Sequence, residues 1–152
     1  IGYLGASLAL AKACDKLQGQ FTSGASCIAQ RAALAAVNGD RSTIDAMKNA
    51  FHKRRDMILK LLSEIPGLKS NVPDGAFYVF PEVKSYFGKK FNGTILNNAD
   101  ELSIYLLTEG HVATVSGGAF GDKDCIRISY AASEENIREA LKRIKNALTR
   151  LN

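Results

Sequence analysis

The sequence predicts a layered fold of the α/β or α+β class. Three observations lead to this prediction. Helical periodicity dominates the first 65 residues, whereas the later stretches 76–80, 112–115 and 126–130 are rich in the aromatic and β-branched residues of strands. A helical pattern separates the first two of these strands, and another follows the third. Because a helix lies between two strands, we expect at least one crossover connection.

The N-terminal part of the chain is predicted to be largely helical. The apolar run Ile1–Leu4 is expected to be a strand that has lost its beginning, and residues 5–17 are expected to form a helix. A second helix is expected at 27–37, where Ser23 or Ser26 could cap it through a side-chain oxygen.

A long helix is predicted to begin after Ser42 and Thr43 and to end at Pro66-Gly67. Its length is about 20 residues, which corresponds to about 30 Å. Apolar side chains recur along it at mostly helical spacings. They are Ile44, Met47, Phe51, Ile58, Leu61, Leu62 and Ile65. A helix of this length could bridge two layers or two domains.

Shorter elements make up the rest of the chain. The turn at 73–75 precedes the strand at 76–80, and Asn97 or Asn98 is expected to cap a helix that runs through Glu109. Ser133 has the same role at the start of the last helix. The apolar stripe of that helix consists of Ile137, Ala140, Leu141, Ile144, Leu148 and Leu151.

Composition and charge exclude several classes of function. With 152 residues, 46% hydrophobic and 23% charged, the chain can form an ordinary globular core. The 20 Lys and Arg exceed the 15 Asp and Glu, but the excess is widely spread. Its densest run, 52–55, has a helical pattern and no interleaved aromatic residues, so we expect no nucleic-acid partner. No stretch reaches the ~20 apolar residues that span a bilayer, so no membrane partner is expected.

The cysteines and histidines predict neither a disulfide framework nor a metal site. Cys14, Cys27 and Cys125 lie far apart without a CxxC pair, and we interpret them as reduced core residues of a cytoplasmic protein. His52 and His111 are isolated from each other and from any second ligand.

The strand at 126–130 carries an arginine on its polar face. Because side chains alternate along a strand, its apolar residues share one face while Arg127 and Ser129 share the other. A guanidinium on a rigid strand is suited to bind a planar carboxylate through two parallel hydrogen bonds. The alternative is an arginine that is merely solvated on a half-exposed sheet, and spacing alone leaves both interpretations open.

A glycine-rich loop, SGGAFG at 116–121, precedes this strand. It lacks the GK[ST] ending of a phosphate-binding loop, so we interpret it as a mobile loop beside a site. No serine lies in a GxSxG motif, no histidine accompanies a nucleophilic cysteine, and no carboxylate pair stands out. The residues alone therefore predict a binding arginine without a catalytic group.

Several separated segments of the chain carry a family resemblance. They are IGYLGA at 1–6, QFTSGASCIAQRAALAAVNG at 20–39, FHKRRDMILKLLSEIPGL at 51–68, PDGAFYVFP at 73–81, GGAFG at 117–121 and IRISYAASEENIREALKRI at 126–144. In this order they resemble the C-terminal part of class I pyridoxal-phosphate aminotransferases, the aspartate aminotransferase family. The resemblance covers essentially the whole chain.

The resemblance implies a set of site residues. Arg127 matches the family arginine that binds the α-carboxylate of the amino-acid substrate, and Phe120 matches the loop at the mouth of the site. Thr22 and Ser23 resemble a segment near the cofactor phosphate of the partner subunit in the family homodimer. The family usually has proline before the glycine loop, where this chain has Ser116, which leaves the loop less rigid.

The resemblance also implies an architecture and a limit. Residues 44–152 are expected to form a small α+β domain, and 1–43 a remnant of the large cofactor-binding domain whose apolar surface is left exposed. The lysine that forms the Schiff base with pyridoxal phosphate would fall before Ile1, so the chain alone is expected to be inactive and not to bind the cofactor. The intact enzyme is expected to transfer amino groups between an L-amino acid, most simply aspartate, and a 2-oxo acid. Alternatives are aromatic, alanine or kynurenine-type specificity, or a non-catalytic binding or dimerisation domain.

Overall fold

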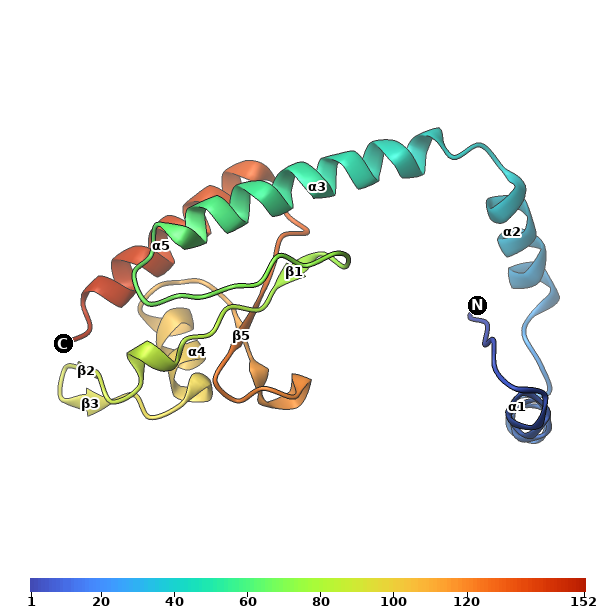
Figure 1. Ribbon diagram of the computed structural model, residues 1–152, viewed down its shortest axis with the longest axis horizontal. Coiled ribbons are helices and arrows are strands. Elements are labelled where there is room, and N and C mark those ends of the chain that lie inside the picture. Colours follow the sequence, from blue (N-terminus) through green and yellow to red (C-terminus); the bar gives the residue numbers. More distant parts are fainter. The chain divides into compact units, whose positions relative to one another are not determined.

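The structure is a computed structural model that describes all residues, 1–152. The chain divides into two compact units, Ile1–Asp45 (unit 1) and Ala46–Asn152 (unit 2). The expected combination of helices with small sheets is confirmed, because helices occur in both units and strands in unit 2 (Figure 1).

Unit 1 consists of helices and irregular segments. Helix α1 covers Leu8–Phe21 and helix α2 covers Cys27–Asn38. The strand predicted at Ile1–Leu4 is wrong, because these residues have no regular structure. The physical reason is that a strand needs hydrogen-bonding partners on a neighbouring strand, and unit 1 contains no other strand. Ser26 is the N-cap residue of α2, but its side chain makes no capping hydrogen bond.

The helices of unit 1 have no buried residues. Large apolar side chains are exposed along both of them, and Phe21 at the end of α1 is 82% exposed. The expectation that this part of the chain leaves apolar surface uncovered therefore agrees with the structure. The prediction that all cysteines are core residues is wrong for Cys27, which is exposed, and Cys14 is only partly buried, whereas Cys125 is buried. All three are free thiols.

The main sheet of unit 2 has three short strands in the order β1-β5-β4. Strands β1 (Tyr78–Val79) and β4 (Val115–Ser116) both pair antiparallel with β5 (Ile126–Ser129). They therefore run parallel to each other, and helix α4 (Ala99–Thr108) lies in the connection between them. The predicted crossover is confirmed. A separate hairpin joins β2 (Lys90–Phe91) and β3 (Thr94–Ile95).

All three strands of this sheet are shorter than predicted: β5 ends one residue early, and β1 and β4 are shortened further for local reasons. Ala76 has a φ of 64°, a left-handed conformation that interrupts an extended backbone, so β1 does not include the start of the predicted 76–80 run. The backbone N–H of Val112 donates to the carbonyl of Leu106 at 3.0 Å and closes the end of α4. This N–H is therefore not available to the sheet, and β4 begins only at Val115.

The helices of unit 2 begin where their capping residues predict. The Asn98 side chain accepts the N–H of Glu101 at 2.9 Å, and the Ser133 side chain accepts the N–H of Asn136 at 3.1 Å. Ser133 thereby caps α5, Glu134–Thr149. The long predicted helix is α3, Ser42–Ser63, which begins in unit 1 and continues into unit 2. Two short 3-10 helices, Lys84–Tyr86 (η1) and Gly117–Phe120 (η2), complete the unit.

Helices α3 and α5 run side by side along the sheet (Figure 1). The ion pair Lys53–Glu134 joins the two helices, and Lys145 of α5 pairs with Glu64, the residue directly after α3. Between the helices and the sheet lies one hydrophobic core, to which α3, α4, α5, β1 and β5 all contribute. Met47 belongs to the predicted stripe of α3 but is 52% exposed, and the buried residues of α3, Ile58 and Leu62, lie in the C-terminal half of the helix. None of the helices has both the length and the apolar composition needed to cross a lipid bilayer.

Candidate functional site

The two faces of the main sheet differ in burial. On β5, Ile126 and Ile128 are buried, whereas Arg127 between them is half-buried and Ser129 is exposed. Val115 of β4 lies opposite Arg127, and Tyr78 of β1 lies opposite Ser129. Cross-strand partners share a face of a sheet, so Arg127 projects from the face that also carries Tyr78 and Val115.

Two aromatic rings flank the guanidinium of Arg127. Its Cζ atom lies 4.3 Å from the ring centroid of Phe120 and 5.3 Å from that of Tyr78. Both distances fall within the range of cation–π attraction. The structure thus brings together Arg127 and Phe120, two residues singled out from the sequence. We call Arg127, Phe120 and Tyr78 the arginine cluster.

Sequence reasoning did not single out Tyr78. It lies diagonally across from Arg127, because its direct partner Ser129 is two residues along β5. Diagonal neighbours are within reach of long and aromatic side chains. The contact between Tyr78 and Arg127 depends on the register between β1 and β5. The sequence patterns of these two strands, which are 47 residues apart, do not reveal that register.

The guanidinium of Arg127 has no anionic partner within the chain. Seven ion pairs are present, and none includes Arg127, although Arg55, Arg143 and Arg150 each contact a carboxylate. A guanidinium has five N–H donors in a fixed planar fork, and stacking on aromatic faces uses none of them. The arginine cluster can therefore accept a planar carboxylate from outside the chain.

A tight loop positions Phe120 over Arg127. The backbone N–H of Gly117 donates to the carbonyl of Cys125 at 2.8 Å, and the carbonyl of Gly117 accepts the N–H of Asp122 at 3.2 Å. A Cβ atom at Gly117 would lie 2.2 Å from the Asp122 carbonyl oxygen, so only glycine fits there. Gly121 ends the 3-10 turn with a φ of 93°. The loop is therefore tied to β5 at its base, while Phe120 at its end is 48% exposed.

Cys125, at the base of this loop, is not a nucleophile. Its burial, together with a hydrogen bond and the negative charge of Asp122, raises the pKa of its thiol from 9.0 to about 11. A thiol with this pKa is almost entirely protonated at neutral pH, and only the thiolate reacts. The only buried cysteine thus has a packing role.

Thr22 and Ser23 lie in unit 1, just after α1. The Thr22 hydroxyl donates to the carbonyl of Gln18 at 3.2 Å and accepts from the Gln18 side-chain nitrogen at 2.9 Å. Ser23 is exposed, adopts a φ of 59° and has no hydrogen-bond partner for its hydroxyl. Ser23 is therefore the freer of the two hydroxyls for contact with a phosphate.

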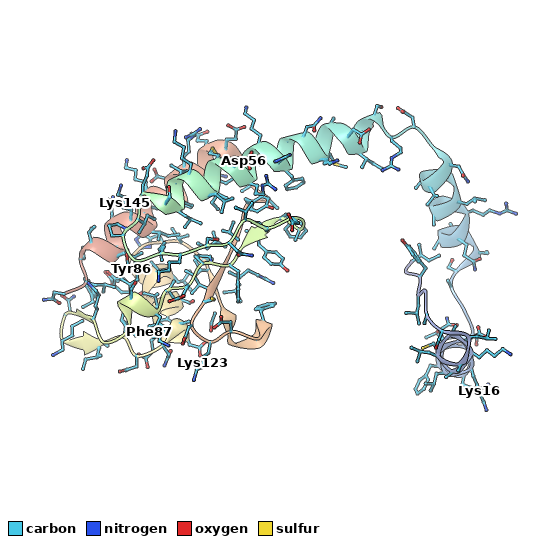
Figure 2. All side chains as sticks on the ribbon, in the orientation of Figure 1. Lys16, Asp56, Tyr86, Phe87, Lys123 and Lys145 are labelled. Atoms are coloured by element: carbon cyan, nitrogen blue, oxygen red, sulfur yellow. The ribbon has the colours of Figure 1, made fainter.

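The lysines do not complete a pyridoxal phosphate site. All twelve are exposed except Lys89, which is half-buried and lies 5.7 Å from the Tyr86 ring. Lys123 and Lys145 point outward from unit 2 (Figure 2). A lysine that reacts with an aldehyde needs a pKa lowered by burial or by neighbouring cations. The ion pairs and cation–π contacts of the lysines involve Glu134, Asp124, Glu64 and Tyr86, and none involves a residue of the arginine cluster. The residues present therefore fit the substrate side of such a site but do not by themselves fit the cofactor. No group of potential ligands for a metal ion is present.

Comparisons with known proteins place these features in context. A family model described as "Aminotransferase class I and II" matches residues 1–144. The bifunctional aspartate aminotransferase and glutamate/aspartate-prephenate aminotransferase of Petunia hybrida is 45% identical over 152 residues, a match that covers 97% of this chain and 32% of the relative.

Solved structures show the same similarity. The aspartate aminotransferase of Rhizobium meliloti has a TM-score of 0.86 and 40% identity, and the match covers 95% of this chain and 36% of that one. The aromatic aminotransferase of Pyrococcus horikoshii has a TM-score of 0.75 and 32% identity, and the match covers 88% of this chain and 34% of that one. The chain spans about a third of the length of the curated relatives that it matches.

Proposed function

Because this chain belongs to the class I and II aminotransferase family, we propose that it is the C-terminal part of an enzyme that transfers an amino group between an L-amino acid and a 2-oxo acid. The resemblance carried by the sequence segments is confirmed at the level of the family. Aspartate is the proposed amino donor, since relatives at 38–45% identity are named for it. The observation that carries the proposal is the half-buried guanidinium of Arg127, which has no anionic partner in the chain.

Arg127 is proposed to bind the α-carboxylate of the substrate. Two parallel N–H···O bonds fix both the position and the plane of a carboxylate. The orientation of the substrate then determines which bond at the α-carbon is presented to the reacting groups. Phe120 covers one face of the guanidinium and limits the access of water there, which strengthens the ion pair.

The family implies pyridoxal phosphate in the intact enzyme. We propose that Thr22 and Ser23 contact its phosphate across a homodimer, while the reactive lysine belongs to a part of the enzyme outside this chain. We further propose that 44–152 is the small domain and 1–43 a part of the large domain. The exposed apolar side chains of unit 1, such as Phe21, support this division, because a surface of this kind normally packs against other protein. The chain alone is proposed to be inactive and not to bind the cofactor.

A second substrate is favoured by the names of the relatives. Relatives from Petunia hybrida and from Rhizobium leguminosarum are named for prephenate as well as aspartate. We therefore propose prephenate as a further 2-oxo acid acceptor. Selection between acceptors depends on the part of the substrate remote from the carboxylate that Arg127 binds.

The test is an activity assay with the full-length protein loaded with pyridoxal phosphate. Aspartate and 2-oxoglutarate should give oxaloacetate and glutamate, followed through reduction of oxaloacetate by NADH and malate dehydrogenase. Arg127→Ala should lower kcat/KM for aspartate by about 10- to 100-fold, because a charged hydrogen-bond pair contributes about 1.5–3 kcal/mol. Arg54→Ala is the matched control, since Arg54 is also half-buried and lies 5.5 Å from the Phe51 ring.

Two results would contradict the proposal. One is the absence of transamination with aspartate and with prephenate in the loaded wild-type protein. The other is an Arg127→Ala variant whose kcat/KM equals that of Arg54→Ala. The first would favour a non-catalytic binding domain, and the second would move the carboxylate site elsewhere.

A further inference from the structure

We propose that Tyr78 is a positioning residue of the carboxylate site, an inference that rests on the proposed function of Arg127. Together with Phe120, its ring holds the guanidinium in the orientation that binds a carboxylate. Tyr78 acts through Arg127 and need not contact the substrate. Tyr78 lies within the segment PDGAFYVFP at 73–81, but its contact with Arg127 is seen only in the three-dimensional structure.

The first argument is the geometry of the arginine cluster. The rings of Phe120 and Tyr78 lie 4.3 and 5.3 Å from the Cζ atom of Arg127 and belong to different elements, η2 and β1. Both elements are attached to β5: Tyr78 through strand pairing, and the loop through the Gly117–Cys125 hydrogen bond. Each ring is therefore held in place relative to β5 by its own backbone hydrogen bonds. The two rings contact the guanidinium of Arg127 from two different elements.

The second argument concerns the hydroxyl of Tyr78. The hydroxyls of the other tyrosines of unit 2, Tyr86, Tyr105 and Tyr130, each donate to a backbone carbonyl. Tyr78 makes no such bond, and its ring is held instead by strand pairing and by an edge-to-face contact with Phe77 at 6.2 Å. The ring, rather than the hydroxyl, is thus the part of Tyr78 that the structure uses.

The consequence for binding follows from the entropy of the arginine side chain. An arginine without an ion pair loses rotamer freedom when it binds an anion, and this loss weakens binding. Where aromatic rings already restrict the guanidinium, less freedom is lost for each hydrogen bond formed. A cation–π contact of the usual strength corresponds to a change of about 2- to 30-fold in affinity.

The test compares three variants of the full-length, cofactor-loaded enzyme. Tyr78→Leu, which removes the ring, should raise the KM for aspartate about three- to tenfold and leave kcat within about twofold. Tyr78→Phe, which keeps the ring, should behave as the wild type. The matched control is Phe91→Leu, because the Phe91 ring lies 5.3 Å from the Cζ atom of Arg150, the same distance as in the Tyr78 contact.

Three results would overturn the proposal: a wild-type KM in Tyr78→Leu, an equal rise in KM in Tyr78→Phe, or an equal rise in Phe91→Leu. The second would assign the effect to the hydroxyl, and the third to a general loss of stability. A failure of the proposed function is distinguishable, because it would appear as inactivity of the wild-type enzyme or as an Arg127→Lys variant with unchanged KM.

A second measurement does not depend on activity. In the 152-residue chain labelled with ¹⁵N, the Nε–H signal of Arg127 should be displaced by the ring currents of Phe120 and Tyr78. Tyr78→Leu should reduce this displacement, whereas Phe91→Leu should change only the signal of Arg150. An Arg127 signal that is the same in wild type and Tyr78→Leu would show that the ring does not hold the guanidinium, and would overturn the proposal.

Discussion

Gly117 is the position where a single methyl group should have the largest effect on the loop that carries Phe120. A Cβ atom there would lie 2.2 Å from the carbonyl oxygen of Asp122, 2.6 Å from that of Cys125 and 2.7 Å from the ring of Phe80. Two of these neighbours are backbone atoms in hydrogen bonds, so they cannot move without breaking the loop. Overpacking of this kind costs about 1–3 kcal/mol, and loss of the Gly117–Cys125 hydrogen bond adds about 1 kcal/mol. We therefore predict that Gly117→Ala lowers the free energy of unfolding by about 2–4 kcal/mol.

Gly118 provides the control for this prediction. A Cβ atom at Gly118 would meet only the Ser116 hydroxyl, at an ordinary contact distance of 4.0 Å, so Gly118→Ala should stay within about 0.5 kcal/mol of the wild type. Urea unfolding of the full chain can be followed by tyrosine fluorescence, since the chain lacks tryptophan and four of its five tyrosines lie in unit 2. The midpoint should fall by about 1–2 M in Gly117→Ala. Equal midpoints for the two alanine variants would refute the reasoning.

Two further predictions concern caps and thiols. Asn98→Ala and Ser133→Ala should each lower the free energy of unfolding by about 1 kcal/mol, because each removes a capping hydrogen bond. Ser26→Ala should not change it, because the Ser26 side chain makes no capping bond. Urea unfolding followed by circular dichroism measures these changes, and equal shifts in all three variants would contradict the prediction. Burial raises the pKa of the Cys125 thiol from 9.0 to about 11, so at pH 8 it should react with a disulfide reagent far more slowly than exposed Cys27, and comparable rates would be the contrary result. On raising the pH, the unfolded chain loses the thiol proton of Cys125 at a lower pH than the folded chain does. The contribution of Cys125 to the free energy of unfolding should therefore decline as pH rises from about 9 to about 11.

The features that the sequence could predict are those determined by local chemistry. Asn98 and Ser133 cap their helices as expected, because the capping bond joins residues three apart. The alternation at Ile126–Ser129 gave the correct faces of β5, because it depends only on the pleat of a strand. The strand expected at Ile1–Leu4 is absent because strands depend on distant partners, and no pattern within four residues contains that information.

Only part of the candidate site could be predicted from the sequence. Arg127 lies on the predicted polar face, but its lack of an ion pair could not be foreseen, since the pairing of Arg55, Arg143 and Arg150 depends on which carboxylates approach in three dimensions. Tyr78 was missed because its contact depends on the register between β1 and β5. The roles proposed for Arg127 and Phe120 rest on the family resemblance, which implies a carboxylate substrate that the spacing of the residues alone does not.

The binding of a dicarboxylate that cannot react tests the central proposal most directly. Succinate should be titrated by calorimetry into the full-length, cofactor-loaded protein and into its Arg127→Ala and Arg54→Ala variants. We predict that Arg127→Ala weakens binding about 10- to 100-fold, as expected for a lost charged hydrogen-bond pair, and that Arg54→Ala binds as the wild type does. Equal dissociation constants for the wild type and Arg127→Ala would mean that Arg127 is only a solvated arginine, and would contradict the proposed function of this site.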